Sequence, residues 1–310
     1  MFAAIDVGSN TVRMLLASVT GDGSLLPLHY FRKVTRLGGG ITSNEGLASE
    51  AMERTLLALQ QCAAELATAR VDGVAAVGTA ALRRAKNGKA FVARIQRETG
   101  LVVDVVDGEK EAYLAATGVL AALDPKPSHA LIFDIGGGST EFILVVDGKH
   151  LFYRSYPLGV VSLCEEGGDP SMQYRQIETC LDALQRDLRR ANLLDLIQDK
   201  RTLLVGTAGT VTTLAALQLG MEKYDWRRVN NLLLTQHDLQ NWARRLGELD
   251  VAERERLPGL EKGRGDLILP GVMIVLQLLR LFSRESLTVS DFGLLEGLLL
   301  EHARITQRLD

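Results

Sequence analysis

Two acids flank a run of three glycines near the middle of the chain. The segment LIFDIGGGSTEF spans residues 131–142 and places Asp134 before the glycines, and Ser139 and Glu141 after them. The glycines are Gly136, Gly137 and Gly138. Because glycine lacks Cβ, it allows positive φ and lets a ligand lie directly on peptide N–H groups. Such a cluster of amides suits a phosphate, and an ordinary glycine-rich β-turn is the alternative.

The two carboxylates add a second requirement. Asp134 and Glu141 would repel a phosphate unless a divalent cation lay between them. Mg²⁺ is usually held by one or two carboxylates together with phosphate oxygens. The flanking residues 131–133 and 142–146 are rich in β-branched and large apolar side chains, which favour strands. The segment is therefore expected to be a β-hairpin whose turn binds phosphate and metal.

The same pattern occurs at the N-terminus. FAAIDVGSNTVRMLL (2–16) aligns with ALIFDIGGGSTEFIL (130–144) at an offset of 128 residues. VAAVGTAAL (74–82) aligns with TLLVGTAGT (202–210) at the same offset. Several matches in order indicate a gene duplication and two similarly folded halves. The two hairpins would then face one another across an interdomain cleft, which is a preferred place for a ligand site.

The first hairpin offers its own candidate ligands. Asp6 aligns with Asp134, and both acids join Glu141 as candidate metal ligands. Arg13 aligns with Glu141; a contact with phosphate and an ion pair within the protein are both open for it. The candidate phosphate ligands of this first loop are Ser9 and Asn10.

A strand, a Gly-Thr turn and a helix start follow each hairpin. Anions favour helix N-termini, so the first amides of each helix are expected to point toward a bound anion. In the first copy, Arg83 lies in the first helical turn and is placed for a bidentate phosphate contact. The candidates in the second copy are Gly206, Gly209 and Thr210. Further candidates for a cationic channel lie in glycine-containing loops: Arg32, Lys33, Arg36, Lys262 and Arg264.

Glu111, in DGEKEAYL, is the single acid with the strongest candidate role in catalysis. It comes at the start of a helix, after a strand end. A carboxylate there is stabilised by the helix dipole, which is one explanation of its presence. Its alternative role is to orient and deprotonate a water that attacks a terminal phosphorus. The residues alone leave both readings open.

These motifs imply an α/β chain of two domains with crossover helices. The boundary is expected near the prolines of DPKPS, which gives domains of 1–124 and 125–298. The second contains a helical insertion at about 217–272, with helices predicted at 235–249 and 265–283, the latter buried. Whether the C-terminal helix, 299–310, joins the first domain is left open.

Composition restricts the class of protein. A formal net charge of -3 argues against general nucleic-acid binding. No apolar run reaches the roughly 18 residues of a membrane span, and no secretory signal is evident, so a soluble, cytoplasmic protein is expected. The three cysteines are scattered and expected to be reduced. A homodimer is left open.

At this point the motifs resemble those of the exopolyphosphatase and guanosine pentaphosphate phosphohydrolase (Ppx/GppA) family, within the actin, sugar-kinase and Hsp70 superfamily. The resemblance covers residues 2 to about 305 and is closest to the short, two-domain form. The motifs, in order, are AAIDVGSNTVRML, RLGGGITSNEGL, GTAALRRAKN, VVDGEKEAYL, DIGGGSTEF, YPLGVVSL, GTAGTVTTLAAL, RGDLILPG and VSDFGLLEGLL.

The resemblance implies two duplicated actin-like (ribonuclease H-like) domains and dependence on Mg²⁺ (or Mn²⁺). It also implies removal of terminal phosphate from inorganic polyphosphate, or of the 5'-γ-phosphate from pppGpp. Glu111 matches the family's catalytic base, and Arg83 matches its anion-binding arginine. The residues matching its two phosphate and metal loops are Asp6, Ser9, Asn10, Asp134, Ser139 and Glu141.

Two positions depart from the family's pattern. Lys110 stands where an acid is common beside the catalytic one, and Leu295 replaces a common arginine. The first puts the metal environment in doubt, and the second a contact of the last helix. A small-molecule kinase of the same fold and a non-catalytic sensor of the alarmone or a nucleotide remain alternatives.

Overall fold

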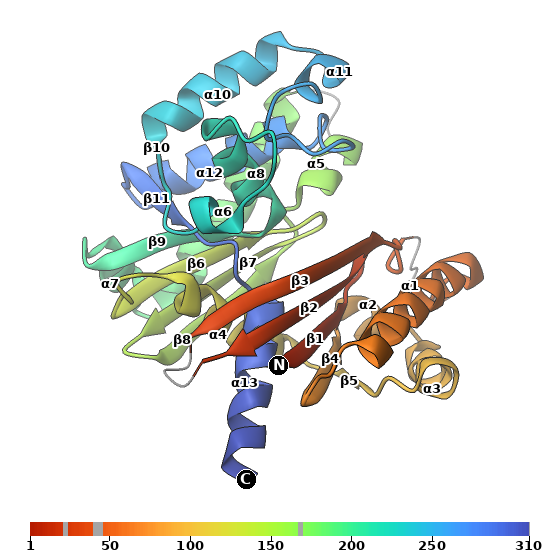
Figure 1. Ribbon diagram of the computed structural model, residues 1–310. Coiled ribbons are helices and arrows are strands. Elements are labelled where there is room, and N and C mark those ends of the chain that lie inside the picture. The colour runs from red at the N-terminus through yellow and green to blue at the C-terminus, as the bar shows by residue number, and fades with distance from the viewer. Residues whose placement is uncertain (21–23, 40–45, 167–169, 310) are drawn as a thin grey trace. The chain divides into compact units, whose positions relative to one another are not determined.

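The computed structural model describes residues 1–20, 24–39, 46–166 and 170–309. It divides into two compact units, each a mixed α/β structure around its own sheet (Figure 1). The first unit comprises Met1–Ala121 and Gly293–Asp310, and the second comprises Ala122–Phe292. The division thus falls at the end of helix α4 (Gly108–Ala122), and helix α13 (Leu294–Leu309) belongs to the first unit over its whole length.

The first unit has a five-stranded sheet in the order β3-β2-β1-β4-β5. Strands β1, β2 and β3 form an antiparallel meander, whereas β4 and β5 continue parallel to β1. Parallel neighbours need crossover connections, which helices α1, α2 and α3 supply. The strands are β1 (Phe2–Val7), β2 (Thr11–Val19), β3 (Leu25–Val34), β4 (Gly73–Gly78) and β5 (Val103–Val105); the helices are α1 (Ser49–Thr68), α2 (Ala80–Arg84) and α3 (Gly88–Thr99).

Alternation along β1 and β2 gives this sheet two buried faces. Ile5, Val7, Val12 and Met14 pack in one apolar cluster with residues of α1 and α3. Ala4 and Leu15 point to the other face and pack against leucines of α13. Because both faces of the sheet are covered, β1 is expected to be apolar along nearly its whole length. Each of its six residues is buried.

Helices α4 and α13 touch through their backbones. A Cβ on Gly118 would lie 1.9 Å from the Gly293 carbonyl oxygen, and one on Gly297 would lie 1.8 Å from that of Leu114. Only glycine fits such an approach, because any side chain would displace the neighbouring helix.

The second unit repeats the plan with one strand added. Its six-stranded sheet has the order β10-β11-β9-β6-β7-β8. Strands β6, β7 and β8 form the meander, and β9 and β11 run parallel to β6. Each thus has an equivalent in the first sheet. The strands are β6 (His129–Ile135), β7 (Thr140–Val146), β8 (Lys149–Tyr156), β9 (Thr202–Thr207), β10 (Leu233–Thr235) and β11 (Ser286–Val289).

The insertion predicted to be helical also contains β10, an edge strand of the sheet, which pairs antiparallel with β11. Three residues are too few to show a period in the sequence, so the prediction missed this strand. Thr235 ends β10 and caps the next helix through a reciprocal pair of hydrogen bonds with Asp238. The helices of this unit are α5 (Val160–Glu166), α6 (Pro170–Arg190), α7 (Leu194–Gln198), α8 (Ala208–Gln218), α9 (Trp226–Val229), α10 (Gln236–Glu248), α11 (Val251–Arg254) and α12 (Ile268–Leu281).

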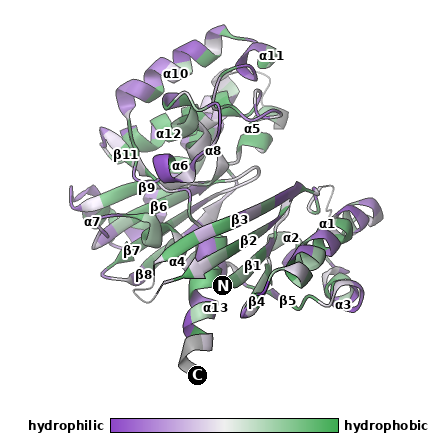
Figure 2. Cartoon of the chain, viewed as in Figure 1, coloured by the Kyte–Doolittle hydropathy of each residue, from purple (hydrophilic) through white to green (hydrophobic). Residues whose placement is uncertain are grey.

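Helix α12 is the buried centre of the second unit. It was expected to be apolar nearly all round, and ten of its residues are buried. Figure 2 shows it as mainly hydrophobic, whereas α10 is mainly hydrophilic. In the part of the chain that the structure describes, no helix combines the length and apolar character needed to cross a membrane.

Candidate functional site

The two predicted hairpins form, and their turns close with the same bond. The Gly8 amide donates to the Thr11 carbonyl at 3.0 Å, and the equivalent Gly136 amide donates to the Ser139 carbonyl at 2.9 Å. The duplication therefore extends to the local geometry of the turns. The three glycines of the second turn do not adopt positive φ, so that expectation was wrong. Crowding explains Gly136 instead, because a Cβ there would lie 3.1 Å from the Ser139 carbonyl oxygen.

A second backbone segment packs on each turn. A Cβ on Gly38 would lie 2.9 Å from Ser9 Cβ, and one on Gly159 would lie 2.1 Å from the Gly137 carbonyl oxygen. The Val161 amide at the start of α5 donates to that same carbonyl at 2.8 Å. This contact fixes the carbonyl side of the turn and leaves Gly137 and Gly138 exposed. Exposed glycine backbone of this kind is suited to binding phosphate oxygens.

The first loop is neutralised within the protein. Asp6 is 3% exposed, and its Oδ2 accepts from Arg13 Nη2 at 2.6 Å and from Arg13 Nε at 3.0 Å. Of the two readings left open for Arg13, the structure shows the ion pair. Asp6 Oδ1 is buried and has no hydrogen-bond partner within the described residues. Ser9 and Asn10 lie in the turn and are exposed, and their carbonyls accept from residues 35, 36 and 38.

The second loop carries two like charges at the equivalent positions. Asp134 and Glu141 are cross-strand partners on β6 and β7, as Asp6 and Arg13 are on β1 and β2. Like charges directly opposite one another destabilise a sheet unless something compensates them. Glu141 Oε1 accepts from Ser139 Oγ at 2.7 Å and from Ser155 Oγ at 2.6 Å.

Ser155 was missed in the sequence. It lies on β8 opposite Glu141 in the antiparallel register. The signal that would have found it is the register itself, since extending the hairpin into a third strand places residue 155 beside 141. Its hydroxyl and that of Ser139 hold the Glu141 carboxylate in one orientation.

The donor set of these loops fits a hard divalent cation. In the second loop, the carboxylates of Asp134 and Glu141 are oxygen donors of the kind that Mg²⁺ and Mn²⁺ prefer. Residues 1–20, 24–39, 46–166 and 170–309 contain no cluster of three or more His, Cys, Asp or Glu side chains able to hold a metal alone. A cation here would depend on oxygens of the substrate as well.

Glu111 lies in the first turn of α4 and is held there by Arg83. Asp107 caps the helix by accepting from the Lys110 amide at 2.8 Å. Arg83 Nη1 donates to the Val106 carbonyl at 2.6 Å and to Glu111 Oε2 at 3.2 Å. Both side chains are 31% exposed. The structure thus brings together two candidates that the sequence placed in separate motifs.

Helix α2, which carries Arg83, is shorter than the motif suggested. It spans five residues, Ala80–Arg84, because the chain turns at residues 85–87 before α3 begins. The dipole of a single turn is small, so the expected anion site at its N-terminus receives little support.

The candidates at the second Gly-Thr turn have different surroundings. A Cβ on Gly206 would meet Phe133 at 2.8 Å and Val211 at 2.9 Å, so Gly206 serves packing. Thr210 is 7% exposed and donates to the Ile135 carbonyl at 3.3 Å, which ties α8 to β6. These contacts give both residues structural roles, and their predicted contact with phosphate stays a prediction.

Gly209 differs from Gly206 and Thr210, because the positively charged side chain of Arg264 lies against it. A Cβ there would be 2.3 Å from Arg264 Nη1, so the guanidinium lies against the start of α8. Arg264 is 23% exposed and is oriented by Glu261 Oε2, 2.9 Å from its Nε. Of the other cations proposed for a channel, Arg32, Lys33, Arg36 and Lys262 are exposed. Residues 40–45 of the adjoining glycine-rich motif lie outside the described residues.

The two departures from the family pattern have structural explanations. Lys110 Nζ pairs with Glu301 on α13 and lies 4.9 Å from the Tyr113 ring centroid. Leu295 is 3% exposed and packs in the core between α13 and the first sheet. Lys110 therefore links two helices, and Leu295 contributes to packing.

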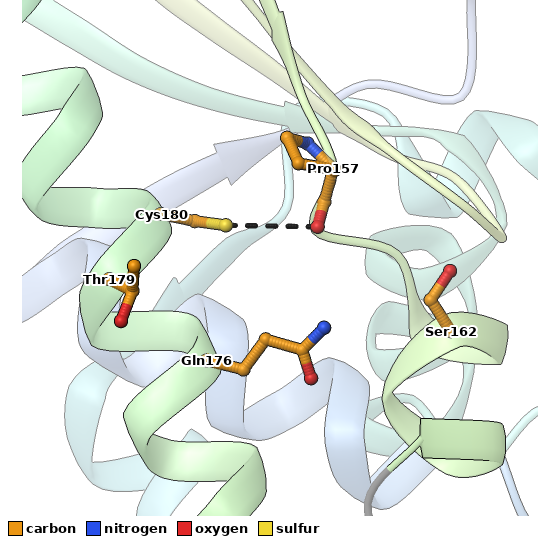
Figure 3. Close-up of a pocket in the computed structure, with 5 residues that line it drawn as sticks. All are labelled: Pro157, Ser162, Gln176, Thr179 and Cys180. Carbon is orange, nitrogen blue, oxygen red and sulfur yellow. Dashed lines mark hydrogen bonds between the residues drawn. The ribbon is translucent and has the colours of Figure 1, made fainter.

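A cavity of about 360 Å³ lies beside the second loop (Figure 3). Ser162, at the start of α5, lies on one side of it, and Gln176 and Thr179, on α6, lie on the other. The described side chains that line it are uncharged: Pro157, Ser162, Gln176, Thr179 and Cys180. Burial raises the pKa of the Cys180 thiol, and this thiol donates to the Pro157 carbonyl at 3.7 Å.

Comparison with known proteins agrees with this geometry. The family model of the Ppx/GppA phosphatase family matches residues 17–305. The chain is 31% identical to exopolyphosphatase 2 of Mycobacterium tuberculosis, over 97% of this chain and 98% of that protein.

Two solved structures share the fold over nearly their whole length. A Ppx/GppA family member from Aquifex aeolicus is 32% identical, covers 98% of this chain and 97% of its own, and gives a TM-score of 0.82. An exopolyphosphatase from Cytophaga hutchinsonii is 28% identical, covers 97% of this chain and 98% of its own, and gives a TM-score of 0.81. The predicted mixed α/β fold with two duplicated units is confirmed. The chain belongs to the Ppx/GppA phosphatase family.

Proposed function

We propose that this protein is an exopolyphosphatase that releases terminal orthophosphate from inorganic polyphosphate. The observation that carries the proposal is Glu111, a partly exposed carboxylate held by Arg83 at the start of α4. A carboxylate fixed in this way can orient a water molecule for attack on phosphorus. The similarity to exopolyphosphatase 2 of Mycobacterium tuberculosis supports the same reaction class.

In the proposed reaction, Glu111 accepts a proton from the attacking water. The water oxygen bonds to the terminal phosphorus while the bond from that phosphorus to the bridging oxygen breaks. The products are orthophosphate and a chain shorter by one unit. Phosphoryl transfer depends mainly on positioning and charge stabilisation, so most of the work falls on groups that hold oxygens in place.

The second loop is proposed to supply those groups. The exposed backbone of Gly137 and Gly138 would bind phosphate oxygens, and Arg264 on Gly209 would add a cation. Asp134 and Glu141 are the residues of this loop that would hold Mg²⁺ or Mn²⁺. When bound, the cation would neutralise negative charge on the phosphate oxygens.

The test is release of orthophosphate from long-chain polyphosphate with Mg²⁺ and no acceptor. Glu111→Gln should lower kcat by about 10² to 10⁴ and leave polyphosphate binding nearly intact, because it removes general-base catalysis alone. Glu109→Gln is the matched control, since Glu109 is an exposed acid in the same helical turn. Unchanged phosphate release by Glu111→Gln would remove Glu111 from this role.

The same assay separates the alternatives. A small-molecule kinase would transfer phosphate only when an acceptor is present, and a sensor would bind polyphosphate or nucleotide without turnover. Release of free orthophosphate without acceptor contradicts both.

A second candidate substrate, pppGpp, is favoured by the cavity beside the second loop. Ser162 is shared between the two features, since its amide donates to the Gly137 carbonyl at 3.2 Å and its side chain lines the cavity. A cavity of about 360 Å³ lies in the usual range for small-molecule sites, and the described side chains that line it are uncharged, which suits a nucleoside better than a polyanion.

Gln176→Leu tests this second candidate. It should raise KM for pppGpp by about tenfold, the cost of one lost hydrogen bond, and leave polyphosphate hydrolysis unchanged. Gln96→Leu, on the exposed surface of α3, is the control for the same substitution. Equal effects of Gln176→Leu on both substrates would count against a nucleoside site.

A further inference from the structure

We propose that Arg83 is a positioning residue, which holds the Glu111 carboxylate in its reactive orientation rather than binding substrate phosphate. The proposal rests on the function proposed above, in which Glu111 orients the attacking water. It replaces the anion-binding role that the resemblance implied for this arginine.

The guanidinium of Arg83 forms hydrogen bonds at the start of α4. Its Nη1 donates both to the Val106 carbonyl at 2.6 Å and to Glu111 Oε2 at 3.2 Å. The shorter of these bonds goes to backbone, so the backbone carbonyl anchors the guanidinium. A guanidinium with one nitrogen shared between a carbonyl and a carboxylate fixes their relative position.

The carbonyl that anchors Arg83 is itself fixed. The Val106 amide donates to the Gly78 carbonyl at 3.1 Å, which joins this peptide to the end of β4. Val106 immediately precedes Asp107, the residue that caps α4. The Glu111 amide then donates to the Asp107 carbonyl at 3.0 Å and forms the first turn.

The backbone of Arg83 is also held in place by a hydrogen bond. Its own amide donates to the Thr79 carbonyl at 3.0 Å within the single turn of α2, directly after β4. Hydrogen bonds therefore link the end of β4 to Val106, Val106 to the Arg83 guanidinium, and that guanidinium to Glu111.

This arrangement matters because the proposed reaction depends on orientation. A carboxylate that is 31% exposed can adopt several rotamers, and the bond to Arg83 selects one of them. A misplacement of about 1 Å in a reacting group can cost about 10²-fold in rate. Losing Arg83 should therefore reduce the rate of the chemical step while substrate binding persists.

Kinetics of four variants separate the two roles. Arg83→Gln should lower kcat by about 10²-fold and change KM for polyphosphate by less than about twofold. In the Glu111→Gln background, Arg83→Gln should lower kcat by less than about threefold, because residues that act as a unit are not additive. Arg83→Lys should behave like Arg83→Gln, since the shorter lysine side chain does not bring its nitrogen to the position of Nη1. Arg84→Gln is the control, because Arg84 is the exposed neighbour on α2.

Three results would overturn the proposal. A rise in KM of about tenfold or more with kcat unchanged would show that Arg83 binds substrate. Equal losses of kcat from Arg83→Gln with and without Glu111 would show that the two residues act independently. Wild-type turnover by Glu111→Gln would remove Glu111 as the base on which this proposal rests, whereas absence of phosphate release from the wild-type protein would overturn the proposed function itself. If thermal unfolding shows that Arg83→Gln is not folded, Arg83→Lys carries the same double-mutant cycle.

Discussion

The backbone contact between α4 and α13 predicts that Gly118→Ala destabilises the first unit. The new Cβ would lie 1.9 Å from the Gly293 carbonyl oxygen and 2.8 Å from the Gly297 nitrogen. Ordinary contacts lie at about 3.5 Å, so the two helices must separate locally by about 1.5 Å. The obstacles are backbone atoms, and no rotamer change can relieve them.

The expected cost is the difference between two effects. Overpacking of this kind costs about 3 kcal/mol, whereas replacing glycine by alanine in a helix returns about 1 kcal/mol. The net destabilisation is therefore about 2 kcal/mol, or about 6 °C in the midpoint of thermal unfolding for a unit of this size.

Gly247→Ala is the matched control for the same substitution in a helix. Gly247 lies in α10, is exposed, and a Cβ there would have no heavy atom within 4 Å. This substitution should stabilise the second unit by about 0.5 to 1 kcal/mol through helix propensity alone.

The two units can be followed separately. Trp226 and Trp242 are the chain's two tryptophans, and both lie in the second unit. Tryptophan fluorescence therefore reports that unit, and far-UV circular dichroism reports both. An unfolding midpoint for Gly118→Ala equal to or above that of the wild type would refute the close approach of the helices.

Three further predictions concern charge, backbone strain and a thiol. Glu141→Gln removes the repulsion from Asp134 and should raise stability without metal by about 0.5 kcal/mol while lowering activity, as urea unfolding and phosphate release would show. Ala208 has φ of 64° at the start of α8, so Ala208→Gly should raise stability by about 1 kcal/mol in the same unfolding assay. Burial, with a smaller effect from Glu65, raises the pKa of Cys62 to about 12, so this thiol stays protonated below that pH. It should resist alkylation at pH 8 in the native protein and react once the protein is unfolded.

Local patterns were enough to predict the hairpins and their duplication. The alternation around Asp134 and Glu141 defined both strands and the turn, so the pairing of the two acids followed from register. The buried helix α12 was likewise evident from its continuous apolar composition. These features depend on residues close together in the sequence.

Contacts between distant segments could not be predicted in this way. The bonds of Arg83 to Val106 and Glu111 join two separate motifs, and no local pattern states which atoms an arginine will reach. The glycine turn was predicted on a conformational argument, whereas a Cβ on Gly137 would be crowded by Val161, more than twenty residues away in the sequence. Gly206 and Thr210 were assigned to phosphate because the motif does not show that Phe133 and Ile135 already occupy their surroundings.

The duplicated hairpins have diverged in how their charges are balanced. Asp6 finds its counter-charge in Arg13, inside the protein, whereas the acids of the second hairpin face each other. The second unit therefore gains more from a bound cation than the first, by ligand linkage. A rise in metal concentration should then increase the resistance of the second unit to heat and proteases, and change that of the first unit little.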